Sequence, residues 1–148
     1  NDVIGHMISL NLFNNQDIAL VYLQPTSPLR TFKHIDDAIN LFRSTESNGL
    51  ISVKASTEIP FKAFKIDDKR LQAVFGEEKT TRNRQDLEKT YYPNGAIYIF
   101  KLTTFLDNGS KIPVNNCIPF IMKEEESVDI DSNFDLLIAE NMLNLKKI

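Results

Sequence analysis

The chain of 148 residues lacks several features that mark particular protein classes. Its single cysteine, Cys117, cannot form an internal disulfide, which excludes a disulfide-stabilised scaffold and favours a reducing compartment. The longest apolar run, residues 18–23, is far shorter than the roughly 20 residues that cross a bilayer, and no signal-peptide pattern opens the chain. We therefore expect a cytoplasmic protein that does not enter a membrane.

An excess of positive charge is also absent, because the chain has 17 lysine and arginine residues and 20 aspartate and glutamate residues. This balance argues against a general nucleic-acid binder. Apolar residues make up 42% and charged residues 25% of the chain, which is ordinary for a folded globular protein of one domain. Because the chain opens with Asn1 and a helical pattern, and not with a strand, we expect a fragment of a longer domain.

The apolar pattern predicts an α/β fold. A continuous apolar run at residues 18–23 predicts a strand that is buried on both faces of a sheet. Helical spacing over residues 32–43 and a short apolar run at residues 50–53 complete a strand, helix and strand, which implies a right-handed parallel crossover. Further buried strands are predicted at residues 96–100 and 119–122.

The middle and the two ends of the chain have other patterns. Residues 61–66 alternate apolar and polar side chains, and a turn separates them from residues 71–75, which predicts an antiparallel hairpin with one wet face. The polar residues 76–90 predict an exposed arm or loop, and residues 2–13 predict a helix. A closing helix is expected to bury an apolar stripe of Phe134, Leu137, Ile138, Met142 and Leu145.

Residues 24–30 (QPTSPLR) follow the carboxyl end of the first predicted strand. Ligands of open α/β sheets bind at that edge, and two prolines would stiffen a turn that displays Gln24, Thr26, Ser27 and Arg30. The alternative is a rigid connection in which Thr26 or Ser27 caps the next helix. Residues 93–99 (PNGAIYI) join a turn to a buried strand, and here the alternative is that Asn94 and Gly95 serve the turn.

Residues 127–131 (SVDID) hold the sharpest local pattern. Residues two apart on an extended chain point to the same side, so Asp129 and Asp131 could bind one hard cation between them. Mg²⁺ often uses one or two carboxylates together with substrate phosphates. The alternative is that Asp131 caps the closing helix, with Asp135 in a capping box, while Asp129 is a solvated strand end.

Residues 23–30, 82–87, 93–99 and 127–132, in this order, resemble the acylneuraminate cytidylyltransferases, also called CMP-sialic acid synthetases. The resemblance implies a Rossmann-like nucleotide-diphospho-sugar transferase fold with three layers and a mostly parallel sheet. Residues 1–148 would be the carboxyl-terminal two-thirds of a single cytidylyltransferase domain. The implied reaction joins CMP from CTP to a nine-carbon 2-keto sugar acid, such as N-acetylneuraminate or legionaminate, and releases pyrophosphate with Mg²⁺ as the cofactor.

The resemblance also implies roles for individual residues. Asp129 and Asp131 would hold the Mg²⁺, and one of them would help to deprotonate the attacking hydroxyl. Arg84 would face substrate anions. Substrate binding is assigned to Gln24, Lys62, Gln85, Asn94 and Tyr98. The insertion at residues 59–92 would be a dimerisation arm that reaches the active site of the partner in a homodimer, which would let Arg84 act there.

Two departures from the family keep alternatives open. No glycine-rich basic loop for the CTP phosphates is present, so we expect this chain alone to bind nucleotide poorly and to be inactive. An inactive remnant that dimerises or binds sugar is therefore one alternative, and a sister sugar nucleotidyltransferase is another. Tyr92 stands where many members carry an arginine before the Pro-Asn-Gly turn, so the sugar acid stays open.

Overall fold

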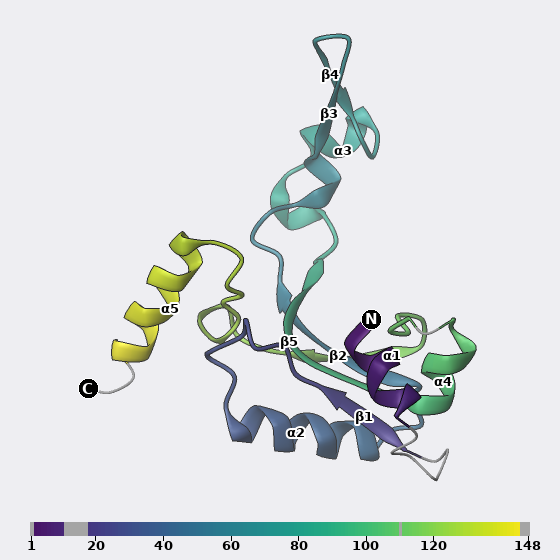
Figure 1. The fold of residues 1–148 in the computed structure, drawn as a ribbon. Helices are drawn as coiled ribbons and strands as arrows, with labels where there is room; N and C mark the ends of the chain where they lie inside the picture. The colour runs from purple at the N-terminus through teal and green to yellow at the C-terminus, as the bar shows by residue number, and fades with distance from the viewer. Residues whose placement is uncertain (1, 11–17, 110, 146–148) are drawn as a thin grey trace. The chain divides into compact units, whose positions relative to one another are not determined.

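The computed structural model describes residues 2–10, 18–109 and 111–145. It divides into two compact units, which are described separately: unit 1 comprises Asn1–Lys54 and Pro93–Ile148, and unit 2 comprises Ala55–Tyr92. Unit 2 encloses residues 59–92, for which an arm was predicted. Figure 1 shows the elements of both units along the chain. No helix within the described ranges is long and apolar enough to span a membrane.

Unit 1 is built on a four-stranded sheet. Its strands, in spatial order, are β1 (Ala19–Tyr22), β5 (Tyr91–Lys101), β2 (Gly49–Ala55) and β6 (Cys117–Ile121). β1 pairs antiparallel with β5, and β2 pairs parallel with β6. The predicted apolar runs at residues 18–23, 50–53, 96–100 and 119–122 therefore all form strands of one sheet.

The direction of β5 makes this sheet mixed. The backbone N–H of Lys101, at the end of β5, donates to the carbonyl of Asn48, just before β2 begins. β5 is therefore antiparallel to β2 as well as to β1, and the other three strands share one direction. α2 (Phe32–Arg43) connects β1 to β2 as predicted, but β5 lies between these two strands. A mostly parallel sheet was expected. Three of the four strands do share one direction, but because β5 lies between β1 and β2, only β2 and β6 are parallel neighbours.

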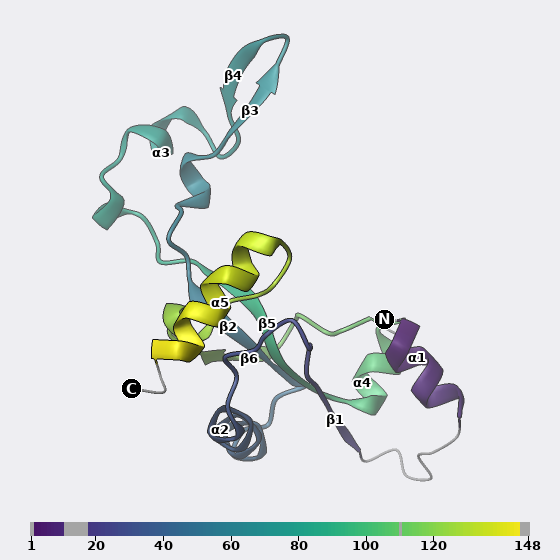
Figure 2. The same cartoon turned by 60° about the vertical axis from the view of Figure 1, so that its left-hand side comes forward.

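Helices cover both faces of this sheet. Alternate residues of β5 point to opposite sides, so Ile97 and Ile99 pack under α2 while Tyr98 and Phe100 face the other layer. That other layer contains α1 (Asp2–Ser9) and α4 (Leu102–Asp107), where Phe105 stacks on Phe100 at 5.3 Å between ring centroids. Figures 1 and 2 show α2 and the α1–α4 pair on opposite sides of the strands. The three-layer α/β prediction is confirmed for unit 1.

Two burial predictions are wrong. β1 was expected to be buried on both faces, but Ala19 and Val21, which share one face of this edge strand, are exposed, while Leu20 and Tyr22 on the other face are half-buried. α5 (Asn133–Leu145) buries Ala139 and not the predicted apolar stripe. Phe134 and Leu145 are exposed, because no described segment covers that side of the helix. The predicted helix at residues 2–13 is seen as α1, and its residues 11–13 lie outside the described residues.

Unit 2 contains the predicted hairpin, β3 (Phe64–Asp67) and β4 (Arg70–Ala73). Positive φ angles at Asp68 and Lys69 close its two-residue turn in the conformation that suits the twist of a hairpin. Residues 76–90, predicted as an arm or loop, include a short helix and a 3₁₀ turn. The remaining elements of the unit are α3 (Glu77–Thr81), η1 (Pro60–Lys62) and η2 (Arg84–Asp86).

The apolar side chains of this hairpin are not covered by unit 2. Phe64, Ile66 and Leu71 are 52%, 76% and 67% exposed. Ile66 is paired with Leu71 across the strands, and Phe64 lies two residues from Ile66, so all three share one face. The hairpin was predicted to have one wet face, and in the structure both faces are exposed.

Candidate active site

The turn at residues 24–30 is fixed by Arg30. Its Nη1 donates to the carbonyl oxygens of Gln24 and of Ala96 in β5, both at 2.8 Å. Burial lowers the pKa of this guanidinium without changing its charge near neutral pH. Arg30 was expected to be displayed to a ligand, but it is turned inward and ties the turn to the sheet. Sequence reasoning missed this role, which depends on a partner 66 residues away.

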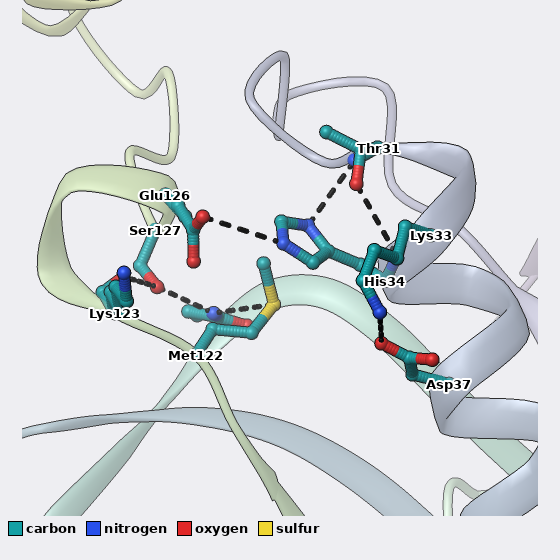
Figure 3. A network of polar contacts seen from close by, with 9 residues as sticks. Thr31, Lys33, His34, Asp37, Met122, Lys123, Glu126 and Ser127 are labelled. Atoms are coloured by element: carbon teal, nitrogen blue, oxygen red, sulfur yellow. Dashed lines mark hydrogen bonds and ion pairs between the residues drawn. The ribbon is translucent and has the colours of Figure 1, made fainter.

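The cap of α2 differs from the predicted one. Thr31, and not Thr26 or Ser27, is the N-cap residue: its Oγ1 accepts from the backbone N–H of His34, while His34 Nδ1 accepts from the N–H of Thr31. Figure 3 shows these two hydrogen bonds, together with the contact between His34 Nε2 and the Glu126 carboxylate at 3.6 Å. Thr26 and Ser27 are left in the turn, where the Ser27 hydroxyl is buried without a described partner.

Gln24 and Asp129 meet above Gly95. The φ of Gly95 is +75°, which favours glycine, and a Cβ on it would lie 2.5 Å from Gln24 Oε1 and 2.9 Å from Asp129 Oδ2. The missing side chain of Gly95 therefore lets an amide and a carboxylate approach the backbone together. The positive φ predicted for the Asn94-Gly95 turn is confirmed at Gly95, whereas Asn94 is extended strand.

Tyr98 belongs to the same group of side chains. Burial raises the pKa of its hydroxyl, and the negative charge of Asp129 raises it further. Tyr98 is therefore neutral near pH 7 and can donate a hydrogen bond. Its ring lies 6.1 Å from that of Tyr22, its partner across β1 and β5. Sequence reasoning missed Tyr22, although alternation along residues 18–23 would have placed it on that face.

Asp129 and Asp131 line a pocket of about 630 Å³ in unit 1. Its ionisable lining residues are Lys54, Glu124, Glu125, Asp129, Asp131 and Asp135. Lys54, 3.5 Å from Glu124, is the one basic residue among the described residues that line the pocket, so the carboxylates exceed the cations and the pocket attracts positive charge. Asp129 Oδ1 is buried and has no hydrogen-bond partner in the described part of the chain.

The donor set of this pocket suits a hard cation with few protein ligands. Carboxylate oxygens are the protein ligands that Mg²⁺ prefers, and it usually keeps sites for water and phosphate oxygens. The described residues contain no cluster of three or more histidine, cysteine, aspartate or glutamate side chains arranged to hold a metal. Two carboxylates, one of them with an unpartnered buried oxygen, fit Mg²⁺ bound together with a phosphate ligand.

The Asp131 carboxylate does not cap α5. Ser132 and Asp135 form the reciprocal cap: Asp135 Oδ2 accepts from Ser132 N at 2.8 Å, and Ser132 Oγ accepts from Asp135 N at 3.3 Å. The hydrogen bond from the Ser132 hydroxyl is the main reason why the pKa of Asp135 is below its ordinary value. The predicted capping box is confirmed, with Ser132 as the cap, and Asp131 is left exposed at the pocket.

Lys62, Arg84 and Gln85 belong to unit 2. Arg84 lines a second pocket, of about 290 Å³, with Glu58 and Glu88, and its guanidinium donates to the Thr57 carbonyl. Gln85 is exposed, and Lys62 ends η1 half-buried. Of the predicted site residues, Gln24 and Asp129 both approach Gly95, and the charge of Asp129 acts on Tyr98. Asp131 and the buried Asn94 line the same pocket as Asp129.

Several curated proteins are similar to this chain, and two of the three described here are named as enzymes that activate a sugar acid. N-Acylneuraminate cytidylyltransferase of Streptococcus agalactiae serotype III is 34% identical over 125 residues, which are 84% of this chain and 29% of that protein. Post-translational flagellin modification protein B of Campylobacter coli is 31% identical over 92% of this chain and 57% of its own length. CMP-N,N'-diacetyllegionaminic acid synthase of Campylobacter jejuni is 36% identical over 52% of this chain and 32% of its own length. These similarities confirm the resemblance that the motifs predicted.

The chain thus spans less than a third of the first curated relatives that it matches. No known family's sequence model matches it. Among solved structures, 4-diphosphocytidyl-2C-methyl-D-erythritol synthase from Anaerococcus prevotii has a TM-score of 0.60 and 13% identity, over 97% of this chain and 64% of that one. This likeness shows a shared α/β fold.

Proposed function

From the similarity to N-acylneuraminate cytidylyltransferases, we propose that this chain is part of an enzyme that transfers CMP from CTP to a nine-carbon 2-keto sugar acid. The observation that supports this most directly is the approach of Gln24 and Asp129 to Gly95, at the edge of an acidic pocket that Asp129 lines. The sugar acid is of the N-acylneuraminate or legionaminate type, which are the acids named in the relatives.

In this reaction the anomeric hydroxyl of the sugar forms a bond to the α-phosphorus of CTP, and the bond to the β-phosphate oxygen breaks. The hydroxyl proton passes to a carboxylate of the pocket, and pyrophosphate leaves. Gln24 and the neutral Tyr98 hydroxyl orient the sugar by hydrogen bonds, which lowers the barrier by placing the hydroxyl for attack. The family resemblance assigns substrate binding to Lys62 and Gln85 of unit 2, and it assigns substrate anions to Arg84, which would act at the active site of the partner in a homodimer.

Asp129 and Asp131 are proposed to hold the Mg²⁺, which offsets the negative charge of the phosphates when it is bound. The unpartnered Asp129 Oδ1 supports this assignment, because a buried carboxylate oxygen without a partner is costly unless a ligand completes it. Without a cation, the acidic pocket would repel a triphosphate.

The enzyme is proposed to be a cytoplasmic homodimer. The exposed apolar face of the hairpin β3–β4 supports a dimer, because large exposed apolar patches mark interaction sites. A second copy would bury Phe64, Ile66 and Leu71. No disulfide is needed for this association, in agreement with a reducing compartment.

The test is a pyrophosphate-release assay with the longest natural form of the protein, CTP, Mg²⁺ and a panel of nonulosonic and octulosonic acids. We expect release with a nine-carbon acid, and a loss of about 100-fold or more in Asp129→Asn, since removal of one preorganised electrostatic group commonly costs that much. Asp37→Asn, on the exposed side of α2, is the matched control and should keep full activity. Release with an eight-carbon acid alone, or no release, would contradict the proposal.

A further inference from the structure

Asn94 is enclosed by the protein itself. It is 3% exposed. Its Oδ1 accepts from the Ser52 hydroxyl at 2.6 Å and from the backbone N–H of Ala96 at 3.2 Å. Its Nδ2 donates to the Ser127 hydroxyl at 2.8 Å and to Met122 Sδ at 3.3 Å. An asparagine amide offers two donors and two acceptor sites, so all four are occupied and none is left for a substrate.

Ser127 connects Asn94 to the segment that carries Asp129 and Asp131, which is called the acidic segment below. It is 2% exposed, and while its Oγ accepts from Asn94 it also donates to the carbonyl of Lys123 at 2.7 Å (Figure 3). The backbone N–H of Ser127 donates to Glu124 as well, which closes the turn of η3 (Glu124–Glu126). The chain is thus fixed to β5 two residues before Asp129.

A second anchor lies on the other side of Asp129. The backbone N–H of Ile130 donates to the carbonyl of Thr26 at 2.9 Å, which joins the segment to the turn at residues 24–30. Asp129 is held between these two points. The carboxylates that line the same pocket repel one another, so a segment held at one end only would move them apart.

We propose that Asn94 and Ser127 are positioning residues, which hold Asp129 and Asp131 in place for a divalent cation, and that Asn94 does not contact substrate. This inference rests on the proposed cation site, and it reassigns Asn94 from the substrate-binding role that the family resemblance implies. Ser52 belongs to the same buried network, but it lies on β2, and its hydrogen bonds in the described part of the chain go to Asn94 and to the backbone of Ile97.

The experiment compares Ser127→Ala with Ser52→Ala. The two variants are matched, because each removes one serine hydroxyl that is a hydrogen-bond partner of the Asn94 side chain. Mn²⁺ binding is measured by electron paramagnetic resonance, without nucleotide or sugar, and stability by thermal unfolding. We expect both variants to lose stability, because each leaves a buried amide group unpaired. Only Ser127→Ala should weaken Mn²⁺ binding, by about tenfold, while Ser52→Ala stays within about twofold of the unsubstituted protein.

Equal Mn²⁺ affinity in the two variants, or no binding by the unsubstituted protein, would overturn the proposal. If Ser127→Ala does not fold, hydrogen exchange in the unsubstituted, metal-free protein decides: the amides of Ser127 and Ile130 should be protected, and rapid exchange at both would refute the two anchors. Mn²⁺ binding that depends on Ser127 in a protein that releases no pyrophosphate would contradict only the proposed reaction.

Discussion

The site of unit 1 and the hairpin of unit 2 differ in how their side chains are satisfied. In unit 1, polar side chains form hydrogen bonds with segments far away in the chain: Arg30 donates to the carbonyl of Ala96, and Asn94 donates to the Ser127 hydroxyl. In the hairpin β3–β4, the cross-strand ladder satisfies the backbone, while Ile66 and Leu71 stay exposed. The comparison indicates that the proposed site of unit 1 is organised by contacts within the unit, whereas the exposed apolar face of the hairpin is where we propose that a second copy binds.

The largest effect is expected at Gly95, where an added Cβ would have little space. In Gly95→Ala the new methyl group would meet Gln24 Oε1 at 2.5 Å and Asp129 Oδ2 at 2.9 Å, so both side chains must move. A displacement of this size can lower kcat about 100-fold. Gly109→Ala is the control, because Gly109 has a similar φ of +65° but open space around it.

In the control, strain alone should cost about 1–2 kcal/mol and leave activity intact. Pyrophosphate release and thermal unfolding of the two variants separate the effect of backbone strain from the effect of displacing Gln24 and Asp129. An equal loss of activity in both variants would mean that Gly95 serves the backbone conformation only, and that the approach of Gln24 and Asp129 is unimportant.

The second effect tests whether the hairpin surface is covered in solution. Ile66→Lys places a charge on the exposed apolar face, and in a symmetric dimer the change occurs twice. Because burial of one such side chain contributes about 1.5–3 kcal/mol, the dimer dissociation constant should rise at least about 100-fold. Analytical ultracentrifugation measures it. Val114→Lys, at an exposed apolar position of unit 1, should leave association unchanged, and a dimer that survives Ile66→Lys would remove the hairpin from the interface.

The sequence predicts the elements of unit 1 well because local patterns determine them. The bounds of α2 agree with the predicted residues 32–43, since its apolar residues recur at helical spacing and Arg43 is followed by a polar turn. The place of β5 between β1 and β2 could not be predicted, because pairing between strands depends on contacts far apart in the chain. For the same reason the exposure of α5 was missed: an apolar stripe does not say whether anything covers it.

For the site, the sequence indicated which residue types take part, but it did not indicate which way their side chains point. The Asp129-x-Asp131 spacing indicated a cation ligand, and both residues line one pocket. Arg30 and Asn94 are polar residues inside motifs, which suggested ligand contact, yet Arg30 Nη1 donates to two backbone carbonyls and the Asn94 amide is satisfied by buried partners. Whether a polar side chain faces a ligand or its own protein depends on its tertiary partners, which a single sequence does not display.

A smaller effect is expected at Arg30, which connects two segments of the site. Arg30→Lys keeps the charge, but the lysine side chain is one atom shorter than the chain that ends in Arg30 Nη1, so its nitrogen should not reach both carbonyl oxygens of Gln24 and Ala96. The turn that carries Gln24 should loosen, and the KM for the sugar acid should rise about tenfold, which corresponds to the loss of one hydrogen bond to a charged group. Arg43→Lys, at the exposed end of α2, is the control. Steady-state kinetics with varied sugar acid would contradict the clamp if both variants behaved alike.

The smallest effect concerns the ionisation of Tyr98. Its pKa is raised chiefly by burial and then by the charge of Asp129, so above the ordinary value of 10.0 the unfolded chain loses this proton before the folded protein does. The Tyr98 contribution to stability is therefore complete below that pH and is lost as the pH rises through the folded pKa. Tyr98→Phe should make the alkaline decline of the urea midpoint shallower, whereas Asp129→Asn should lower the Tyr98 pKa only in part, because burial remains. Full return of that pKa to its ordinary value in Asp129→Asn, followed by ultraviolet absorbance, would show that charge and not burial controls this hydroxyl.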